Sequence, residues 1–217
     1  MTVRKKKEQV FMTELTHEKL KRIKQSFRPL MNGVVAQSMR EKGLNYHLNW
    51  GVTLTDLQKM AEEYGKDYEL AVELWKENIR ECKILATLIM PAEQMFPELV
   101  DLWMEQTDTT EIAEHACFNL YQHLDFAPVL AYQWMAAEDE MRQMCGYLVL
   151  TRLFMRGQEP NERGINEFLD QAETALASEN NALRRAAIKS IQRFAELGDD
   201  YLLVARKAFK SYNLELF

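Results

Sequence analysis

The sequence predicts an all-α fold made of stacked antiparallel helix pairs. Apolar residues recur every three or four positions along most of the chain, as in the series Trp75, Ile79, Cys82, Ala86 and Ile89. This spacing places them on one face of an α-helix. The 5 prolines and 8 glycines lie mostly between such series, where helices end. Long stretches of period-two alternation do not occur, so we expect no β-sheet.

Helices are expected wherever the helical period holds. Their ranges are 15–28, 31–42, 53–64, 67–79, 80–90, 94–106, 109–124, 127–136, 139–157, 161–176, 180–196 and 199–212. Thr53 and Thr55 lie at the start of one helix and Asn180 at the start of another, where such side chains can accept hydrogen bonds from first-turn N–H groups. The connections are short, so successive helices must pack as antiparallel neighbours. From about residue 67 onward the pairs recur at the spacing of a helical solenoid repeat, roughly 30 to 40 residues.

The 217 residues suffice for one domain with its own core. We expect that domain over residues 15–217, and a flexible basic arm over residues 1–14. The basic N-terminus lacks the apolar stretch of a secretory signal, and no apolar run is long enough to span a bilayer. Cys82, Cys117 and Cys145 lie far apart in apolar helical stretches, which predicts buried, reduced thiols. These features predict a cytoplasmic protein.

Charge is distributed unevenly along the chain. Residues 1–50 carry 11 basic and 4 acidic side chains, residues 51–150 carry 6 and 19, and residues 151–217 carry 10 of each. An acidic middle segment is unfavourable for gripping phosphates, and it is also typical of a solvated helical surface. Charge alone therefore leaves both a nucleic-acid partner and a protein partner open.

Two of the expected helices carry basic residues at one-turn spacing. Arg152 and Arg156 form a pair on the helix over 139–157, and Arg185, Lys189 and Arg193 form a stripe on the helix over 180–196. The stripe lies opposite that helix's apolar face, so the cations must face outward. A solvated polar face explains these residues, and so does a surface that follows DNA phosphates.

Acidic residues and a histidine cluster on the helix expected over 109–124. Glu111, Glu114 and His115 do not have the HExxH zinc spacing, and the other histidines are scattered, so we expect no metal site. Glu114 is either a catalytic carboxylate or a solvated or salt-bridged side chain. The sequence contains no glycine-rich phosphate loop and no nucleophile elbow, so we expect no cofactor.

The stretch LWKENIRECKILA at residues 74–86 resembles the "LW…RE.R.LA" helix of the AlkD-type DNA alkylation repair family. The segment PELVDLW at 97–103, Gly51-Val52 ahead of a short helix, and the arginine-bearing segments near 142 and 185 follow in the same order. The resemblance spans roughly residues 15–212. It implies a HEAT-like α–α superhelix with a concave, DNA-facing groove. The active members of this family are cofactor-independent glycosylases of base excision repair, which remove alkylated purines such as 3-methyladenine and 7-methylguanine.

The resemblance also implies a catalytic site, and this sequence departs from it. The family places an aspartate one helical turn after a tryptophan, and further aromatics and an arginine line the groove. The carboxylate stabilises the developing oxocarbenium ion, and the indole faces attract the cationic sugar or base. Glu114 takes the aspartate position. Thr110 and Lys189 stand where the family has tryptophans. Met144 stands where the family has the arginine, and Arg142 lies two residues before it.

The missing aromatic residues define the functional expectation. We predict a divergent member of the family that binds double-stranded DNA and has weak or altered alkylpurine glycosylase activity. Its DNA contacts would come from Arg142 and from the basic pair and stripe described above. The alternative is a non-catalytic HEAT-like scaffold that holds a protein partner in its concave groove, because solenoids of this kind offer long binding surfaces.

Overall fold

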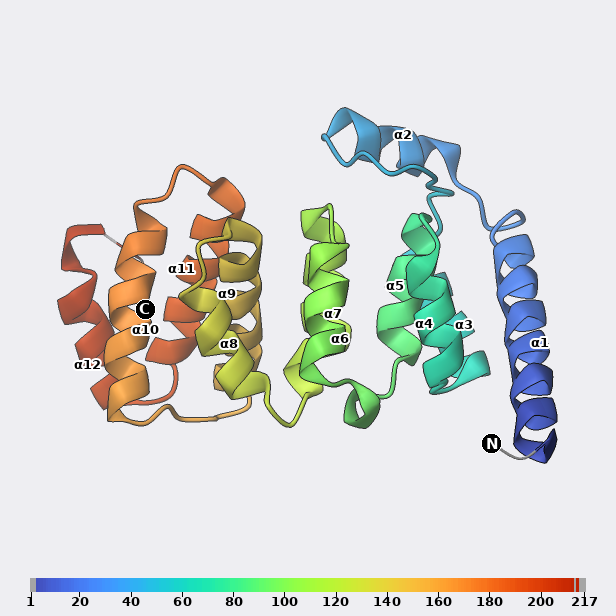
Figure 1. Cartoon of the computed structure of the whole chain (residues 1–217). Helices are drawn as coiled ribbons and strands as arrows, with labels where there is room; N and C mark the ends of the chain where they lie inside the picture. The colour runs from blue at the N-terminus through green and yellow to red at the C-terminus, as the bar shows by residue number, and fades with distance from the viewer. Residues whose placement is uncertain (1–2, 213, 215–217) are drawn as a thin grey trace. The chain divides into compact units, whose positions relative to one another are not determined.

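The computed structural model describes residues 3–212 and 214, and side chains from residue 14 onward. Helices make up 72% of the chain. Within the described residues there is no β-strand, and Leu48 and Ile79 form an isolated parallel bridge. The all-α prediction is therefore confirmed (Figure 1).

The chain forms two compact units, residues 1–115 and residues 116–217, and the boundary between them falls inside helix α7. Unit 1 holds the helices α1 (Val3–Ser26), α2 (Gly33–Glu41), α3 (Leu54–Tyr64), α4 (Tyr68–Lys76), α5 (Arg80–Ile89), α6 (Pro97–Glu105) and the first part of α7 (Thr110–Asn119), with a 3-10 turn η1 (Ala92–Gln94). Unit 2 holds the end of α7, α8 (Ala127–Met135), α9 (Glu140–Met155), α10 (Glu162–Leu176), α11 (Asn181–Ala195) and α12 (Asp199–Ala208), with 3-10 turns η2 (Tyr121–His123) and η3 (Lys210–Tyr212). The flexible arm over 1–14 and the single domain over 15–217 stay predictions.

The core of unit 1 is centred on α4 and α5, which pack against each other. Helix α1 packs on α4, and α3 packs on α5. The indoles of Trp75 and Trp103 are buried and stacked, with ring centroids 4.1 Å apart. Stacked indoles bury a large apolar area at a fixed geometry, which explains why both side chains lie on apolar helix faces.

In unit 2, α9 lies between α8 and α11. An aromatic cluster joins α9, α10 and α11, because the rings of Phe154, Phe168 and Phe194 contact one another in pairs. The predicted apolar face of α11 is buried as expected, with Ile191 and Phe194 both at 0% exposure. Its polar positions consequently face outward.

Several predicted helices are shorter than expected, and three of them have bounds with a local explanation. The helix expected over 109–124 ends at Asn119, because Leu120 leaves the helical backbone conformation, and in η2 the carbonyl oxygen of Gln122 accepts a hydrogen bond from Arg156. The helix expected over 67–79 ends at Lys76, since Ile79 pairs with the loop before α3. The helix expected over 94–106 begins at Pro97, because the residue preceding a proline is restricted to extended backbone.

None of the described helices is long and apolar enough to cross a membrane. The three cysteines are free and buried, as predicted. Thr53 and Asn180 cap α3 and α11 through their side chains, which confirms both sequence-based cap positions.

Gly146 provides a test of the close packing between α8 and α9. In an open helix, glycine-to-alanine substitution stabilises by about 1 kcal/mol. Here a Cβ would lie 2.6 Å from the backbone nitrogen of Met135 and 2.7 Å from the carbonyl oxygen of Ala131. Because these are backbone atoms, the two helices must separate, and we expect Gly146→Ala to lower the free energy of unfolding by about 1–3 kcal/mol in urea denaturation.

The matched control is Gly33→Ala at the start of α2, where no neighbouring heavy atom lies within 4 Å. This variant should leave stability unchanged or slightly raised. A Gly146→Ala protein as stable as the wild type would contradict the close approach of α8 and α9.

Candidate nucleic-acid interface

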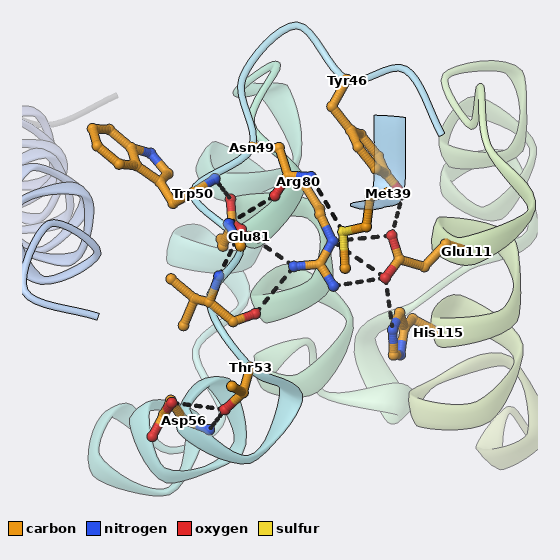
Figure 2. Close-up of polar contacts among 12 residues, drawn as sticks. Met39, Tyr46, Asn49, Trp50, Thr53, Asp56, Arg80, Glu81, Glu111 and His115 are labelled. Atoms are coloured by element: carbon orange, nitrogen blue, oxygen red, sulfur yellow. Dashed lines mark hydrogen bonds and ion pairs between the residues drawn. The ribbon is translucent and has the colours of Figure 1, made fainter. Parts of the chain in front are cut away.

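A buried polar network in unit 1 fixes the loop of residues 44–53, which connects α2 to α3. Figure 2 shows Arg80 at its centre, between Glu81 and Glu111. Arg80 and Glu81 begin α5, and Glu111 lies in the first turn of α7. The network therefore ties two helices and one loop together at a single point.

Glu81 is completely buried and holds the loop by its backbone. Its carboxylate accepts hydrogen bonds from the backbone N–H groups of Trp50, at 3.2 Å, and Val52, at 3.3 Å. Arg80 Nη1 donates to the same carboxylate at 3.2 Å and to the carbonyl oxygen of Val52 at 3.1 Å. Both backbone polar groups of Val52 are thus satisfied by two adjacent residues of α5.

Arg80 is 4% exposed and binds Glu111 in a bidentate manner. Its Nη2 donates to Glu111 Oε1 at 2.6 Å, and its Nε donates to Oε2 at 3.0 Å. The hydroxyl of Tyr46 also donates to Glu111 and lies 3.0 Å from the hydroxyl of Thr109. A planar guanidinium fits a carboxylate in this geometry, and such a pair is among the strongest charged hydrogen bonds in proteins.

The network sets the protonation of its members. Burial raises the pKa of Glu111, but the hydrogen bonds from Arg80 and Tyr46 outweigh burial and leave this pKa below its ordinary value. Burial, with the bond to Glu111, raises the pKa of Tyr46. Burial lowers the pKa of His115, which lies 4.0 Å from Glu111. At neutral pH Glu111 is therefore ionised, whereas Tyr46 and His115 are neutral.

Gly51 allows α2 to rest directly on this loop. Its φ of +71° favours glycine, and a Cβ there would lie 2.2 Å from the carbonyl oxygen of Asn32. The backbone N–H of Asn32 donates to the carbonyl oxygen of Trp50 at 2.8 Å. The loop that Arg80 and Glu81 hold is thus also the support of α2.

Basic side chains gather on α9 and α11, which are neighbours in unit 2 (Figure 1). We define the basic face as Arg152, Arg185, Lys189 and Arg193. Arg152 is close enough to Arg193 that their repulsion, after burial, lowers the pKa of Arg152. Arg185 and Lys189 are exposed and have no polar partner among the residues that the structure describes. The basic face therefore brings together four of the six predicted DNA contacts.

The other members of the predicted set have different surroundings. Arg156 donates to the side-chain oxygen of Gln122 at 3.2 Å and to its carbonyl oxygen at 2.6 Å, so its guanidinium holds η2 in place. Arg142 lies in the first turn of α9 and is half-buried. Glu114 lies on α7 and is exposed. These roles in DNA binding and catalysis stay predictions.

Two positions of the basic face also have partners within unit 2. The guanidinium of Arg152 lies over the ring of Phe118, 4.2 Å from its centroid, and Arg193 pairs with Glu196. Phe118 is 43% exposed, so an aromatic ring borders the cations at the surface. The sequence analysis missed this ring, although Phe118 breaks the apolar pattern of its helix by facing outward.

Within the acidic cluster on α7, Glu111 is a structural residue that binds Arg80. The sequence analysis weighed Glu111 only as part of a metal or acid–base group, and it missed the partnership with Arg80. No group of three or more potential metal-ligating side chains occurs within the described part of the chain. The adjacent Arg80 and Glu81 inside an apolar stretch were the available signal, because buried charges of opposite sign require partners.

A sequence model of the DNA alkylation repair enzyme family matches residues 23–187. No curated protein matches the chain. One similar solved structure belongs to what is described as a new family of proteins related to the HEAT-like repeat DNA glycosylases with affinity for branched DNA structures. It has a TM-score of 0.78 and 17% sequence identity, and the match covers 88% of this chain and 82% of that one. The predicted HEAT-like fold is thereby confirmed.

Arg80→Met tests the energetic weight of the polar network. The substitution leaves the buried Glu81 and the half-buried Glu111 without their cation, and breaking a buried pair in this way costs about 3–5 kcal/mol. We expect a loss of that size in the free energy of unfolding, measured by urea denaturation. The control is Lys24→Met, which breaks the half-exposed pair with Glu77 at side-chain exposures of 37% and 27%. That variant should lose about 1 kcal/mol or less, so equal losses would refute the central place of Arg80.

Proposed function

The chain belongs to the DNA alkylation repair enzyme family, and from that membership we propose that the protein binds double-stranded DNA through the basic face of unit 2. The observation that carries this proposal is the exposure of Arg185 and Lys189 without a polar partner among the described residues. Cations in this state bind phosphates and release condensed counterions, which drives association with DNA.

The spacing of the cations supports the same function. Residues four apart on α11 are separated by about 6 Å along the helix axis, so the stripe of Arg185, Lys189 and Arg193 forms a row about 12 Å long. Such a row suits contacts along one DNA backbone, which position a protein without reading sequence. Because the similar solved structure belongs to a family with affinity for branched DNA, branched duplexes are included among the proposed ligands.

The proposed catalytic capacity is weak. Thr110 begins α7 where the family has a tryptophan, and Lys189 is exposed where a second one is expected. Neither side chain has a π face to attract a cationic base or sugar. Glu114 lies one turn after Thr110, but a glutamate extends its carboxylate one methylene beyond an aspartate. Since misplacement by about 1 Å can be costly in catalysis, excision of alkylated purines is expected to be slow or absent.

A protein scaffold is the second candidate, and one feature of unit 2 favours it. A groove of about 570 Å³ lies along α8 and α10, with Val129, Tyr132 and Pro160 in its lining. Val129 is 60% exposed there. Exposed apolar side chains in a groove are typical of a surface that binds another protein.

The double substitution Arg185→Ala with Lys189→Ala tests DNA binding by the basic face. Each lost phosphate contact makes the slope of log K against log salt shallower by about 0.9. We therefore expect weaker binding to every duplex sequence alike, with a slope shallower by about 2. Fluorescence anisotropy with a linear duplex across a salt series measures both quantities.

The charge-matched control is Lys207→Ala with Lys210→Ala, which removes two exposed cations from the end of unit 2. It should retain the wild-type slope. If the basic-face variant also retained affinity and slope, its cations would be merely solvated. The scaffold function would then be preferred, with the acidic segment 93–114 as the surface to examine.

Base-release assays with duplexes that carry 7-methylguanine or 3-methyladenine test the catalytic proposal. We expect release close to the spontaneous rate for the wild type, and no further decrease in Glu114→Gln. Glu105→Gln, another exposed glutamate, serves as the control. Robust release that is lost in Glu114→Gln alone would show that this glutamate replaces the aspartate of active members.

A further inference from the structure

The turn before α2 and the start of α2 expose an unusual set of apolar side chains. Leu30, Met31 and Val34 are 37%, 59% and 80% exposed, and we call them the α2 tip. Among the residues of α2, all of which the structure describes, Ala36 is the one with a buried side chain. Figure 1 shows α2 projecting from the body of its unit. Clustered exposed apolar residues of this kind usually mark a binding surface.

The α2 tip is held rigidly although its helix buries little. The side chain of Asn32 caps α2 by accepting from the N–H of Val35 at 3.1 Å. Its backbone N–H binds Trp50, and Gly51 packs against its carbonyl group. The loop of Trp50 and Gly51 is fixed in turn by the Arg80–Glu81 network (Figure 2). The position of the α2 tip is therefore fixed before a partner binds, which reduces the entropy lost on binding.

Charge around the tip favours a polyanion. Residues 28–50 carry 3 basic side chains, Arg28, Arg40 and Lys42, and 1 acidic one, Glu41. Glu41 already accepts a hydrogen bond from Gln37 at 3.0 Å. Residues 51–115 of the same unit carry 5 basic and 15 acidic side chains, so residues 28–50 differ from them in the sign of their charge. An apolar tip flanked by cations suits a nucleic acid better than a basic or neutral protein surface.

We propose that the α2 tip inserts Met31 and Val34 at the branch point of a DNA junction, while Arg28, Arg40 and Lys42 contact the surrounding phosphates. This inference rests on the proposed DNA-binding function. Apolar side chains enter base stacks in several DNA-bending proteins, at an unstacking cost of about a few kcal/mol per step. At a branch the bases are already partly unstacked, so insertion there costs less than insertion into a continuous duplex. The α2 tip would thus confer preference for branched over linear DNA.

The test compares a three-way junction with a linear duplex of equal length, using the full chain and its double variant Met31→Ala with Val34→Ala. Truncating two side chains that are buried on binding should weaken junction affinity about tenfold and leave duplex affinity unchanged. A 2-aminopurine at the branch point should brighten when the wild type binds, because the base loses stacking, and should not brighten with the variant. The control is Leu203→Ala with Val204→Ala, an exposed apolar pair on α12.

The outcomes separate this inference from the proposed function. If the wild type binds both DNAs and the tip variant binds them identically, the inference is wrong and DNA binding by the basic face stands. If the wild type binds neither DNA, both are wrong. If the wild type self-associates in sedimentation and the tip variant does not, with unchanged junction affinity, the tip is an interface between copies of the chain and the inference is also wrong.

Discussion

The ion pair between Arg80 and Glu111 is the interaction on which the arrangement of unit 1 depends. It joins residues 31 positions apart, and it allows Arg80 to remain charged in a site that is 4% exposed. With Arg80 in place, Glu81 can also be buried and can hold the loop after α2 by two backbone N–H groups. Loss of the cation would strand both carboxylates, because a buried charge without a partner is far less stable than a paired one.

The two units use charge in different ways. In unit 1 the charges of the network pair with opposite charges and specify geometry, so that a loop with little apolar burial has one conformation. In unit 2 the cations of α11 lie outside a core of aromatic and small residues, and Arg185 and Lys189 have no role in holding that core together. The charged side chains of the Arg80 network already have partners in the fold and are not available to a ligand. Arg185 and Lys189 are available, because the fold does not depend on them.

Local sequence patterns predicted most of the fold, because helical periodicity, caps and short connections act over a few residues. The buried faces of Trp75 and α11 and the caps at Thr53 and Asn180 all follow from such patterns. The same patterns did not reveal the break after Asn119, nor the contact of Arg156 with the carbonyl group of Gln122, 34 residues away. Nor could they join Arg80 to Glu111, a contact that depends on how α5 and α7 are placed by the whole unit.

Several residues that carry the family resemblance serve the fold. Leu74 and Trp75 are buried in the core, and Arg80 and Glu81 hold the loop that contains Gly51. A chain can therefore keep all of these residues for its fold, whether or not it keeps excision. In the proposed function, excision and binding instead depend on exposed positions such as Glu114, Lys189 and the α2 tip, where substitution scarcely affects stability. Such positions are free to change, so one fold can serve both excision and binding alone.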